Sequence, residues 1–313
     1  MKYPVVIFSF LFVLTSFKGI GQCCSAGNPV GGDGSNDGLG KNDLRIFASY
    51  KYSLSRDYFH YDDKIDVPNM EKSYFDFNMI SVVYGLLPRI SLYSDLGYFI
   101  DKVQEVKINN EKEIIKSHGL GDLGFNVRYI AMKTVKPVSQ LVFSGGIKIP
   151  IGAFNEEMDG ITIPISLQPS SGAFKYNASV FYSRKYANRK FGWNSLVLFE
   201  TSNTINKGFL VYKYGNFCQL SFAGSYHVIE NLILTGNLKY EWRGHDKRES
   251  NIKIESTGSS VFYVNPQLIY NLRHKWAILL MTDIPVYKYV NGYQLTNKFS
   301  FQFGLRRSLS FSK

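Results

Sequence analysis

Apolar and polar residues alternate along most of this chain, beginning at Asp43. In the first run, Leu44, Ile46 and Ala48 share one side, while Arg45 and Ser49 share the other. A period of two is the pattern of a β-strand with two unlike faces. We count about twelve such runs: 44–52, 75–84, 90–98, 123–131, 140–149, 174–183, 191–200, 219–226, 232–242, 262–270, 276–283 and 299–306. The pattern predicts an all-β chain.

The segments between these runs alternate between short and long. Short links such as Gly85–Arg89 and Met132–Pro137 are followed by long ones such as Asp101–Gly119 and Ile151–Gly172, and an intermediate Val286–Leu295 precedes the last run. Outer-membrane barrels have short periplasmic turns and long outer loops. The spacing therefore predicts an antiparallel up-and-down transmembrane β-barrel of about 12 strands over 43–313. A soluble barrel or sandwich would show the same alternation within each strand, so the linkers are what favour the membrane barrel.

Aromatic residues reinforce this interpretation, with 24 Phe, 22 Tyr and 3 Trp against only 10 Pro. Many lie near the ends of the predicted strands, where they would form the two interfacial girdles of a membrane barrel. The candidates are Tyr50, Tyr52, Tyr74, Phe75, Tyr129, Tyr182, Trp193, Tyr240, Trp242, Tyr270 and Trp276.

The N-terminus carries an export signal. Lys2 precedes an apolar run, Val5–Phe17, and Gly19-Ile20-Gly21 resembles a cleavage site, so residues 1–21 are predicted to be a signal peptide. Residues 22–42 form a Gly-rich segment that cannot build a core. No later run is long and apolar enough for a transmembrane helix. We therefore expect an outer-membrane location.

The residues that usually carry catalysis or bind metals are scarce. Cys23, Cys24 and Cys218 are odd in number and have no Cys-x-x-Cys spacing, which excludes a disulfide framework. The histidines fall in predicted loops and turns: His60, His118, His227, His245 and His274. We expect no enzyme, no metal and no cofactor. An outer-membrane lipid-modifying enzyme remains a remote alternative.

The polar faces of the strands give the candidate functional residues. These predicted lumen-lining residues, a candidate solute path, are Arg45, Lys51, Asp76, Asp95, Arg128, Lys148, Lys175, Glu200, Lys239, Glu241, Asp283 and Arg306. Their charges are mixed, with a small basic excess, in a chain of formal net charge +11. Such charges can pair across a narrow barrel and close it, or they can line a watery path. Both alternatives stay open at this point.

Several short motifs resemble a known family. They are Tyr84-Gly85-Leu86-Leu87-Pro88-Arg89, Gly119-Leu120-Gly121-Asp122-Leu123, Gly146-Ile147-Lys148-Ile149-Pro150-Ile151-Gly152, Gln168-Pro169-Ser170-Ser171-Gly172, Asn265-Pro266, Pro285-Val286-Tyr287 and Gly292-Tyr293-Gln294-Leu295. In this order they resemble the outer-membrane barrels named after a meta-pathway of phenol degradation. The resemblance implies a link to uptake of aromatic or other hydrophobic compounds. Ser170-Ser171 stands where the family tends to have Gly-Thr, and Ser312 and Lys313 follow the C-terminal aromatic Phe311.

Together these features predict a monomeric, passive or gated conduit for a small solute. The N-terminal Gly-rich segment is either a gate at the periplasmic mouth or a loose tail. A structural or surface-binding barrel without transport is the alternative function. Expected partners are outer-membrane lipid, lipopolysaccharide and the barrel-assembly machinery, and no nucleic acid. Lysines within 102–116 and 247–253 favour an anionic lipopolysaccharide or polysaccharide, or are merely solvated.

Overall fold

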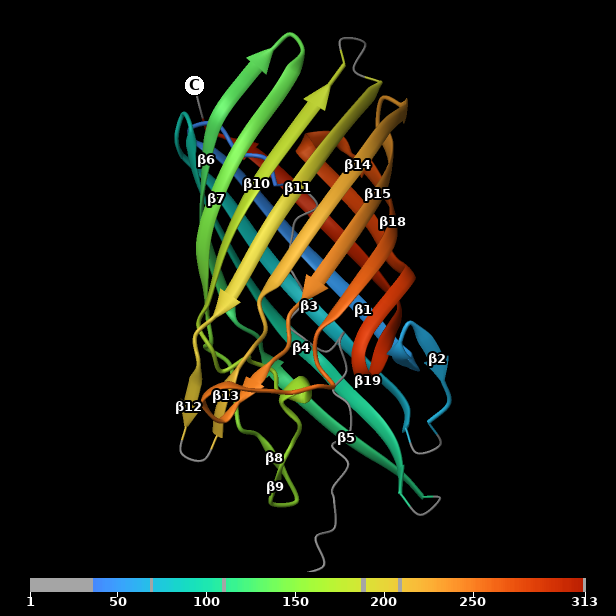
Figure 1. Ribbon diagram of the computed structural model, residues 1–313. Helices are drawn as coiled ribbons and strands as arrows, with labels where there is room; N and C mark the ends of the chain where they lie inside the picture. Colours follow the sequence, from blue (N-terminus) through green and yellow to red (C-terminus); the bar gives the residue numbers. More distant parts are fainter. Residues whose placement is uncertain (1–35, 68–69, 109–110, 187–189, 208–209, 312–313) are drawn as a thin grey trace, which may run out of the picture.

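The computed structural model describes residues 36–311 except 68–69, 109–110, 187–189 and 208–209. The predicted signal peptide and most of the Gly-rich segment lie outside the described residues. The chain forms a closed antiparallel β-barrel (Figure 1). The strands of its wall are β1 (Asp43–Tyr61), β3 (Met70–Leu87), β4 (Ile90–Ile108), β6 (Leu123–Val135), β7 (Val138–Ile149), β10 (Lys175–Lys185), β11 (Phe191–Ser202), β14 (Phe217–Ile229), β15 (Leu232–Arg243), β18 (Ser259–Asn271) and β19 (Trp276–Ser310).

The long strand β19 closes the barrel by passing through the wall twice. Its first part pairs antiparallel with β18, from Ala277 to Val290, and its second part pairs antiparallel with β1, up to Ser310. A single straight strand between β18 and β1 could not be antiparallel to both. The chain reverses at Asn291–Gly292, where Gly292 adopts a positive φ of 60°. The eleven wall elements therefore make the twelve crossings that the alternation predicts.

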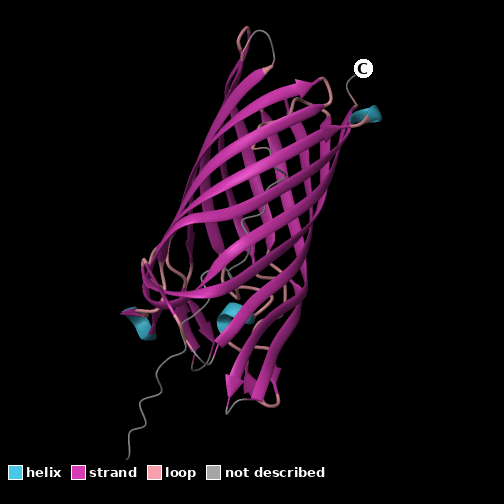
Figure 2. Ribbon diagram, turned by 90° about the vertical axis from the view of Figure 1, so that its right-hand side faces the viewer, coloured by secondary structure: helices cyan, strands magenta, loops and turns pink. Residues whose placement is uncertain are grey.

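The two ends of the barrel differ as the linkers predict. The short turns lie at the top of Figure 1, and the long connections lie at the bottom, which is the outer side by the usual orientation of such barrels. The outer connections contain β2 (Asp63–Ile65), β5 (Glu111–Leu120), β8 (Glu157–Met158), β9 (Ile161–Thr162), β12 (Ile205–Lys207), β13 (Leu210–Lys213), β16 (Lys247–Arg248), β17 (Ile252–Lys253) and the short 3-10 helices η1 (Ile165–Leu167) and η2 (Glu249–Asn251). A third 3-10 turn, η3 (Arg273–Lys275), lies between β18 and β19 (Figure 2).

Two predicted connections are corrected. The segment Asp101–Gly119 is not a loop, because β4 and β5 pair across it from Tyr98 to Leu120 and form a protruding hairpin. The link Val286–Leu295 is a tight turn within β19. In both places the strand pairing continues beyond the membrane, where the side chains no longer need to alternate between lipid and lumen. None of the described helices is long and apolar enough to cross a membrane.

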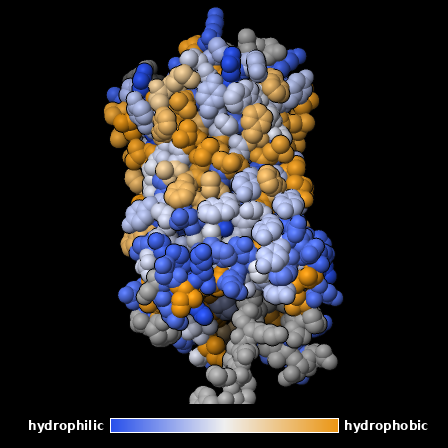
Figure 3. All heavy atoms as spheres, in the orientation of Figure 1, coloured by the Kyte–Doolittle hydropathy of each residue, from blue (hydrophilic) through white to orange (hydrophobic). Residues whose placement is uncertain are grey.

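The outer surface of the wall is apolar. Side chains such as Val127, Val180 and Leu238 are exposed on it, and hydrophobic residues form a broad band above the hydrophilic outer end in Figure 3. This is the surface expected of a barrel whose outside faces lipid. Of the predicted girdle residues, Phe75 is wrongly placed: it is 4% exposed and lies inside the barrel.

The wall is irregular where Pro266 interrupts the pairing of β18 with β19. Val264 pairs with Ile284 and Gln267 pairs with Met281, but Asn265 and Pro266 have no partner on β19. Proline has no N–H to donate to the sheet. Instead, the side chain of Asn265 donates from Nδ2 to the backbone oxygen of Thr282, at 2.6 Å. The Asn265-Pro266 motif thus has an architectural role: it interrupts the backbone pairing of β18 with β19, and the Asn265 side chain supplies a hydrogen bond to β19 in its place.

Candidate functional site

The lumen is the candidate site, and the structure directs eleven of the twelve predicted residues into it. They contact one another across the lumen, contact the N-terminal segment or line its cavities: Arg45, Lys51, Asp95, Arg128, Lys148, Lys175, Glu200, Lys239, Glu241, Asp283 and Arg306. That they form a solute path stays a prediction.

The predicted lumen position of Asp76 is wrong. Its neighbours Phe75 and Phe77 are buried inside the barrel, so Asp76 points to the outer surface, where the hydroxyl of Tyr50 donates a hydrogen bond to it. The sequence pattern assigned to lipid the face of β3 that holds Phe75, Phe77 and Met79, but the opposite face also carries apolar residues, Ile80 and Val82. The face that holds Phe77 instead packs against side chains from distant strands, and a single strand's pattern does not reveal such contacts.

One side of the lumen is filled by apolar side chains. The cluster joins β1, β3, β4 and β19, and consists of Phe47, Phe75, Phe77, Met79, Phe99, Ala277, Leu279 and Met281. Phe47, Phe99 and Leu279 have no exposed surface. Side chains buried to this extent leave little room for water among them. The cavities described below have none of these eight residues in their lining.

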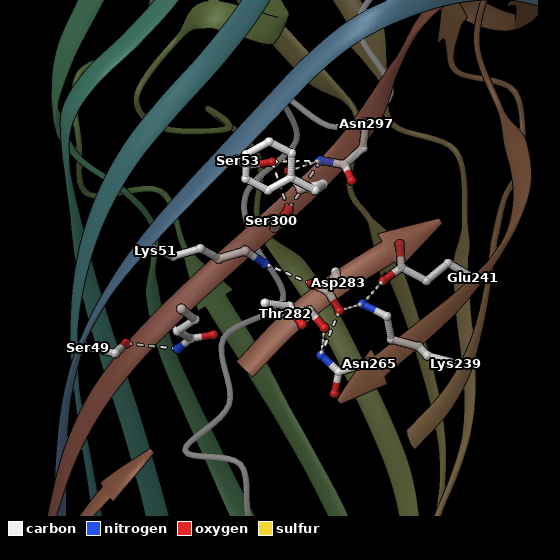
Figure 4. Close-up of polar contacts among 12 residues, drawn as sticks. Ser49, Lys51, Ser53, Lys239, Glu241, Asn265, Thr282, Asp283, Asn297 and Ser300 are labelled. Carbon is white, nitrogen blue, oxygen red and sulfur yellow. Dashed lines mark hydrogen bonds and ion pairs between the residues drawn. The ribbon is translucent and has the colours of Figure 1, made fainter. Parts of the chain in front are cut away.

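A network of ion pairs crosses the lumen beside the apolar cluster (Figure 4). Lys239 Nζ lies 2.9 Å from Asp283 Oδ1 and 3.1 Å from Glu241 Oε1, while Lys51 Nζ lies 3.4 Å from Asp283 Oδ2. Asn265 donates a further hydrogen bond to Asp283, at 3.1 Å. Two lysines and two carboxylates compensate each other here. Because each charge has a partner, this network is suited to holding strands together rather than to attracting an ion.

A second group of charges lies elsewhere in the lumen. Lys148 Nζ is 2.7 Å from Glu200 Oε2, and Lys175 Nζ is 4.0 Å from Glu200 Oε1. One carboxylate thus faces two lysines, so the group has a net positive charge. Lys175 also lies over the ring of Tyr214, at 4.6 Å from its centroid.

Two cavities meet at this second group. The outer cavity, of about 100 Å³, is lined by Lys102, Lys175, Glu200, Arg243 and Asp246 among others. The inner cavity, of about 50 Å³, is lined on its charged side by Asp95, Arg128, Lys148 and Glu200. Glu200 lines both. The Lys148–Glu200–Lys175 group is therefore the partition between the two cavities.

The connection Pro150–Phe174 is folded into the outer mouth and held there by Asp122. The carboxylate of Asp122 accepts hydrogen bonds from the hydroxyls of Ser170 and Ser171, at 2.7 and 2.6 Å, and from the backbone N–H of Ser171. Lys102 Nζ donates to the backbone oxygen of Gln168, at 2.9 Å. The Gln168-Pro169-Ser170-Ser171 motif therefore fixes this connection as the wall of the outer cavity.

The two ionisable groups that border this mouth from the outer connections are both shielded from solvent. Burial raises the pKa of the Tyr214 phenol, and burial also raises the pKa of the Asp246 carboxyl. Asp246 accepts hydrogen bonds from the N–H of Gly215, at 2.7 Å, and from the hydroxyl of Tyr212. Asp246 thereby ties the β15–β16 connection to the β13–β14 connection at the outer mouth. Among the described residues, no cluster of His, Cys, Asp or Glu is arranged to hold a metal ion.

Residues 36–40 lie inside the barrel at the periplasmic end of the inner cavity, which Asn36 lines. Asp37 receives hydrogen bonds from Arg45 Nη1, at 2.6 Å, and its backbone oxygen accepts one from Arg128 Nη1, at 3.1 Å. Gly38 and the amide of Gln140 exchange two hydrogen bonds, of 3.2 and 3.1 Å. Leu39 is buried, 8% exposed. We call residues 36–40 the peg.

Sequence reasoning placed the Gly-rich segment near the periplasmic mouth but missed the contacts of the peg. Asn36 lines the inner cavity, and Leu39 packs against Val83 and Tyr93 within the lumen. A Cβ atom on Gly38 would lie 2.5 Å from Ile130 Cγ1, so only glycine fits there. The sequence did contain a signal for these contacts. Asp37 and Leu39 lie within a glycine-rich run, and the strands that follow carry Arg45 and Arg128 on their inner faces.

Comparisons with known proteins agree with this architecture. A family model described as putative MetA-pathway of phenol degradation matches residues 76–310. An outer-membrane channel from Pseudomonas putida F1 has a similar structure, with a TM-score of 0.70 and 13% identity over 88% of this chain and 98% of that chain.

Two further solved structures match the chain with lower scores. The NanC porin has a TM-score of 0.45 and 11% identity, over 86% of this chain and 100% of that chain. The translocator domain of autotransporter NalP from Neisseria meningitidis has a TM-score of 0.46 and 10% identity, over 87% and 90%. No curated protein sequence matches the chain. The similarity to the Pseudomonas putida F1 structure, with its TM-score of 0.70, shows the fold, an outer-membrane β-barrel.

Proposed function

This chain belongs to the family described as putative MetA-pathway of phenol degradation, and on that premise we propose that it is a gated conduit for small polar solutes across the outer membrane. The path runs from the outer cavity, past the Lys148–Glu200–Lys175 partition, into the inner cavity. The peg closes the periplasmic end. In this state the barrel is shut at two levels, by an ion pair and by a segment of its own chain.

The observation that carries the proposal is that one side chain, Glu200, lines both cavities. Its partners Lys148 and Lys175 lie on opposite sides of the partition, since Lys148 lines the inner cavity and Lys175 the outer one. A passing anion can replace the carboxylate on one lysine and then on the other. Exchange between neighbouring sites of moderate affinity is how narrow pores conduct.

The charges along this path favour anions. Lys102, Lys175, Arg243, Lys148 and Arg128 line the two cavities, against the carboxyl groups of Glu200, Asp246 and Asp95. The family description concerns phenol degradation, yet an unsubstituted aromatic ring would have to displace water from this polar lining without returning hydrogen bonds. A small solute that bears a carboxylate or another anionic group fits the lining better.

We expect the purified, refolded barrel to show a small conductance in planar lipid bilayers, with a reversal potential that indicates anion preference. Lys148→Gln removes a positive charge from the partition, so the preference should fall and cations should contribute more current. Lys51→Gln is the matched control, because Lys51 belongs to the network beside the apolar cluster and lines neither cavity. It should leave the reversal potential unchanged.

Two outcomes would count against the proposal. An absence of current in the wild-type barrel and in a variant lacking the peg would mean that the lumen does not conduct. Equal shifts of the reversal potential in Lys148→Gln and Lys51→Gln would mean that ions do not pass by Glu200.

A further inference from the structure

A small sheet on the outer side of the barrel concentrates positive charge. It is formed by β12, β13, β16 and β17 in that order. These strands contain Lys207, Lys213, Lys247, Arg248 and Lys253, and no acidic residue. The sheet lies beyond the tips of β10 and β11, at the lower left of Figure 1.

The two faces of this sheet have different surroundings. Ile205 and Tyr212 are paired across β12 and β13 and are each 3% exposed, because they pack on Ala173 and the mouth connection. Lys207, two residues after Ile205, points to the same side, where its ammonium lies over the ring of Phe154 at 5.1 Å. On β12 and β13 this inner face therefore points toward the barrel axis, while Arg248 and Ile252, which continue it on β16 and β17, are exposed. Side chains at the alternate positions point away from the axis.

The outward face presents three lysines in a row. Lys213 pairs with Lys247, and Lys247 pairs with Lys253, so the three stand directly opposite one another on adjacent strands. Lys253 is exposed and the other two are half-buried. Lys247 Nζ donates to Asn251 Oδ1 at 2.7 Å, and within the described part of the chain none of the three forms an ion pair. Like charges directly opposite one another destabilise a sheet, so this arrangement is suited to an external anion.

The position of the row identifies the source of that anion. Trp242 is exposed on the lipid-facing surface at the outer end of β15, and Lys247 follows it after one short connection. Lys213 precedes β14 by a similarly short connection. The row therefore stands just outside the apolar band and faces sideways, toward the surrounding outer leaflet. The anionic groups at that depth are the phosphates of lipid A in lipopolysaccharide.

The other lysine-rich segment does not offer a comparable site. Lys102 is 2% exposed and donates to the backbone of Gln168, and Lys112 lies 2.7 Å from Glu105. Its lysines are therefore used within the protein. The row, in contrast, brings Lys213 beside the 247–253 segment, which is distant in sequence.

We propose that Lys213, Lys247 and Lys253 form a docking site for the phosphate groups of a lipid A molecule in the outer leaflet. Each ammonium can donate to phosphate oxygens, and three neighbouring lysines supply the charge that a doubly phosphorylated headgroup requires. The proposal does not depend on conduction through the lumen.

The experiment compares lipid A binding by full-length, refolded variants in a non-ionic detergent. The wild type should bind bisphosphorylated lipid A more tightly than the same lipid A after removal of its phosphates. The variant K213Q/K247Q/K253Q should lose at least about tenfold in affinity for the phosphorylated form. The control K133Q/K136Q/K185Q removes the same charge from exposed lysines at the periplasmic turns and should bind as the wild type does.

Thermal unfolding without lipid provides a second, independent measurement. Because the triple substitution removes repulsion within the sheet, the K213Q/K247Q/K253Q variant should be at least as heat-stable as the wild type, which separates lost binding from lost folding. Equal lipid A affinity in this variant and the wild type would overturn the proposal. A second result would also overturn it: the three lysines are required for binding of a lipid-free acidic polysaccharide such as polygalacturonate, while the protein shows no preference for phosphorylated over dephosphorylated lipid A. Lys253→Gln alone, at the exposed edge, should lower the affinity in the same direction.

Discussion

Deleting Cys23–Gly40 behind an intact signal peptide should raise the single-channel conductance of the refolded barrel by at least about twofold. The deletion removes the peg, whose described residues occupy the periplasmic end of the inner cavity. The barrel itself begins at Asp43 and keeps its pairing with β3 and β19, so assembly should be normal. The arginines Arg45 and Arg128, released from Asp37, would then face water in the lumen.

A point substitution tests the same gate with less disturbance. Asp37→Ala removes the carboxylate that Arg45 contacts and should give more frequent or longer openings in bilayer recordings, while the paired hydrogen bonds of Gly38 and Gln140 remain. Glu230→Ala is the control, because Glu230 is an exposed acid in the β14–β15 turn at the same end of the barrel. Unchanged conductance in both the deletion and Asp37→Ala would show that the Gly-rich segment is a loose tail.

Val180→Arg should destabilise the inserted barrel by about 2–4 kcal/mol. Val180 is exposed on the lipid-facing side of β10, between Tyr176 and Tyr182, so an arginine there would place its charge in hydrocarbon. The adjacent Ser179 lines the inner cavity, where an arginine can be hydrated and can approach the carboxylate of Glu200. Ser179→Arg should therefore cost much less.

Reversible unfolding of the two variants by urea in lipid vesicles, followed by tryptophan fluorescence, measures this difference. Gel mobility before and after heating provides a check on assembly, since a closed barrel runs differently until it is unfolded. Equal losses of stability in Val180→Arg and Ser179→Arg would mean that β10 does not separate lipid from lumen as the structure has it.

The barrel was predictable because its outside imposes a local rule on every strand. A side chain in contact with hydrocarbon is favoured when it is apolar, whatever its neighbours are, so Val127 and Val180 stand in alternation with Asn126 and Ser179. The rule holds strand by strand and does not require knowledge of contacts across the barrel. The lengths of the linkers then give the topology.

Side chains that face the lumen follow no such rule, and for this reason Asp76 was assigned to the wrong face of β3. The lumen near β3 is filled by Phe47, Phe99 and Leu279 from other strands, which makes an apolar inner face favourable. The pattern of β3 alone is compatible with either orientation, since Ile80 and Val82 face lipid while Phe77 and Met79 face the lumen. Only the packing across the barrel decides between them.

The charged residues of the candidate site were found by pattern, but their grouping was not. Lys148, Lys175 and Glu200 lie on β7, β10 and β11, and their contact depends on the register of three strands. The contacts of the peg were even harder to predict from the sequence. Its binding depends on a glycine beside Ile130 and on Gln140, which is distant in sequence. Such contacts arise from the closed barrel rather than from any local preference.

The most direct test of the conduit is to modify one residue within the proposed path and record the current. Ser179→Cys, in a background with Cys23, Cys24 and Cys218 replaced by serine and the peg deleted, places a single thiol in the inner cavity. Reaction with a charged methanethiosulfonate reagent should reduce the single-channel current, because the cavity is too small to hold the adduct and a solute together. Lys136→Cys in the exposed β6–β7 turn should react without changing the current. A complete reaction at Ser179→Cys that leaves the current unchanged would contradict a path through this lumen.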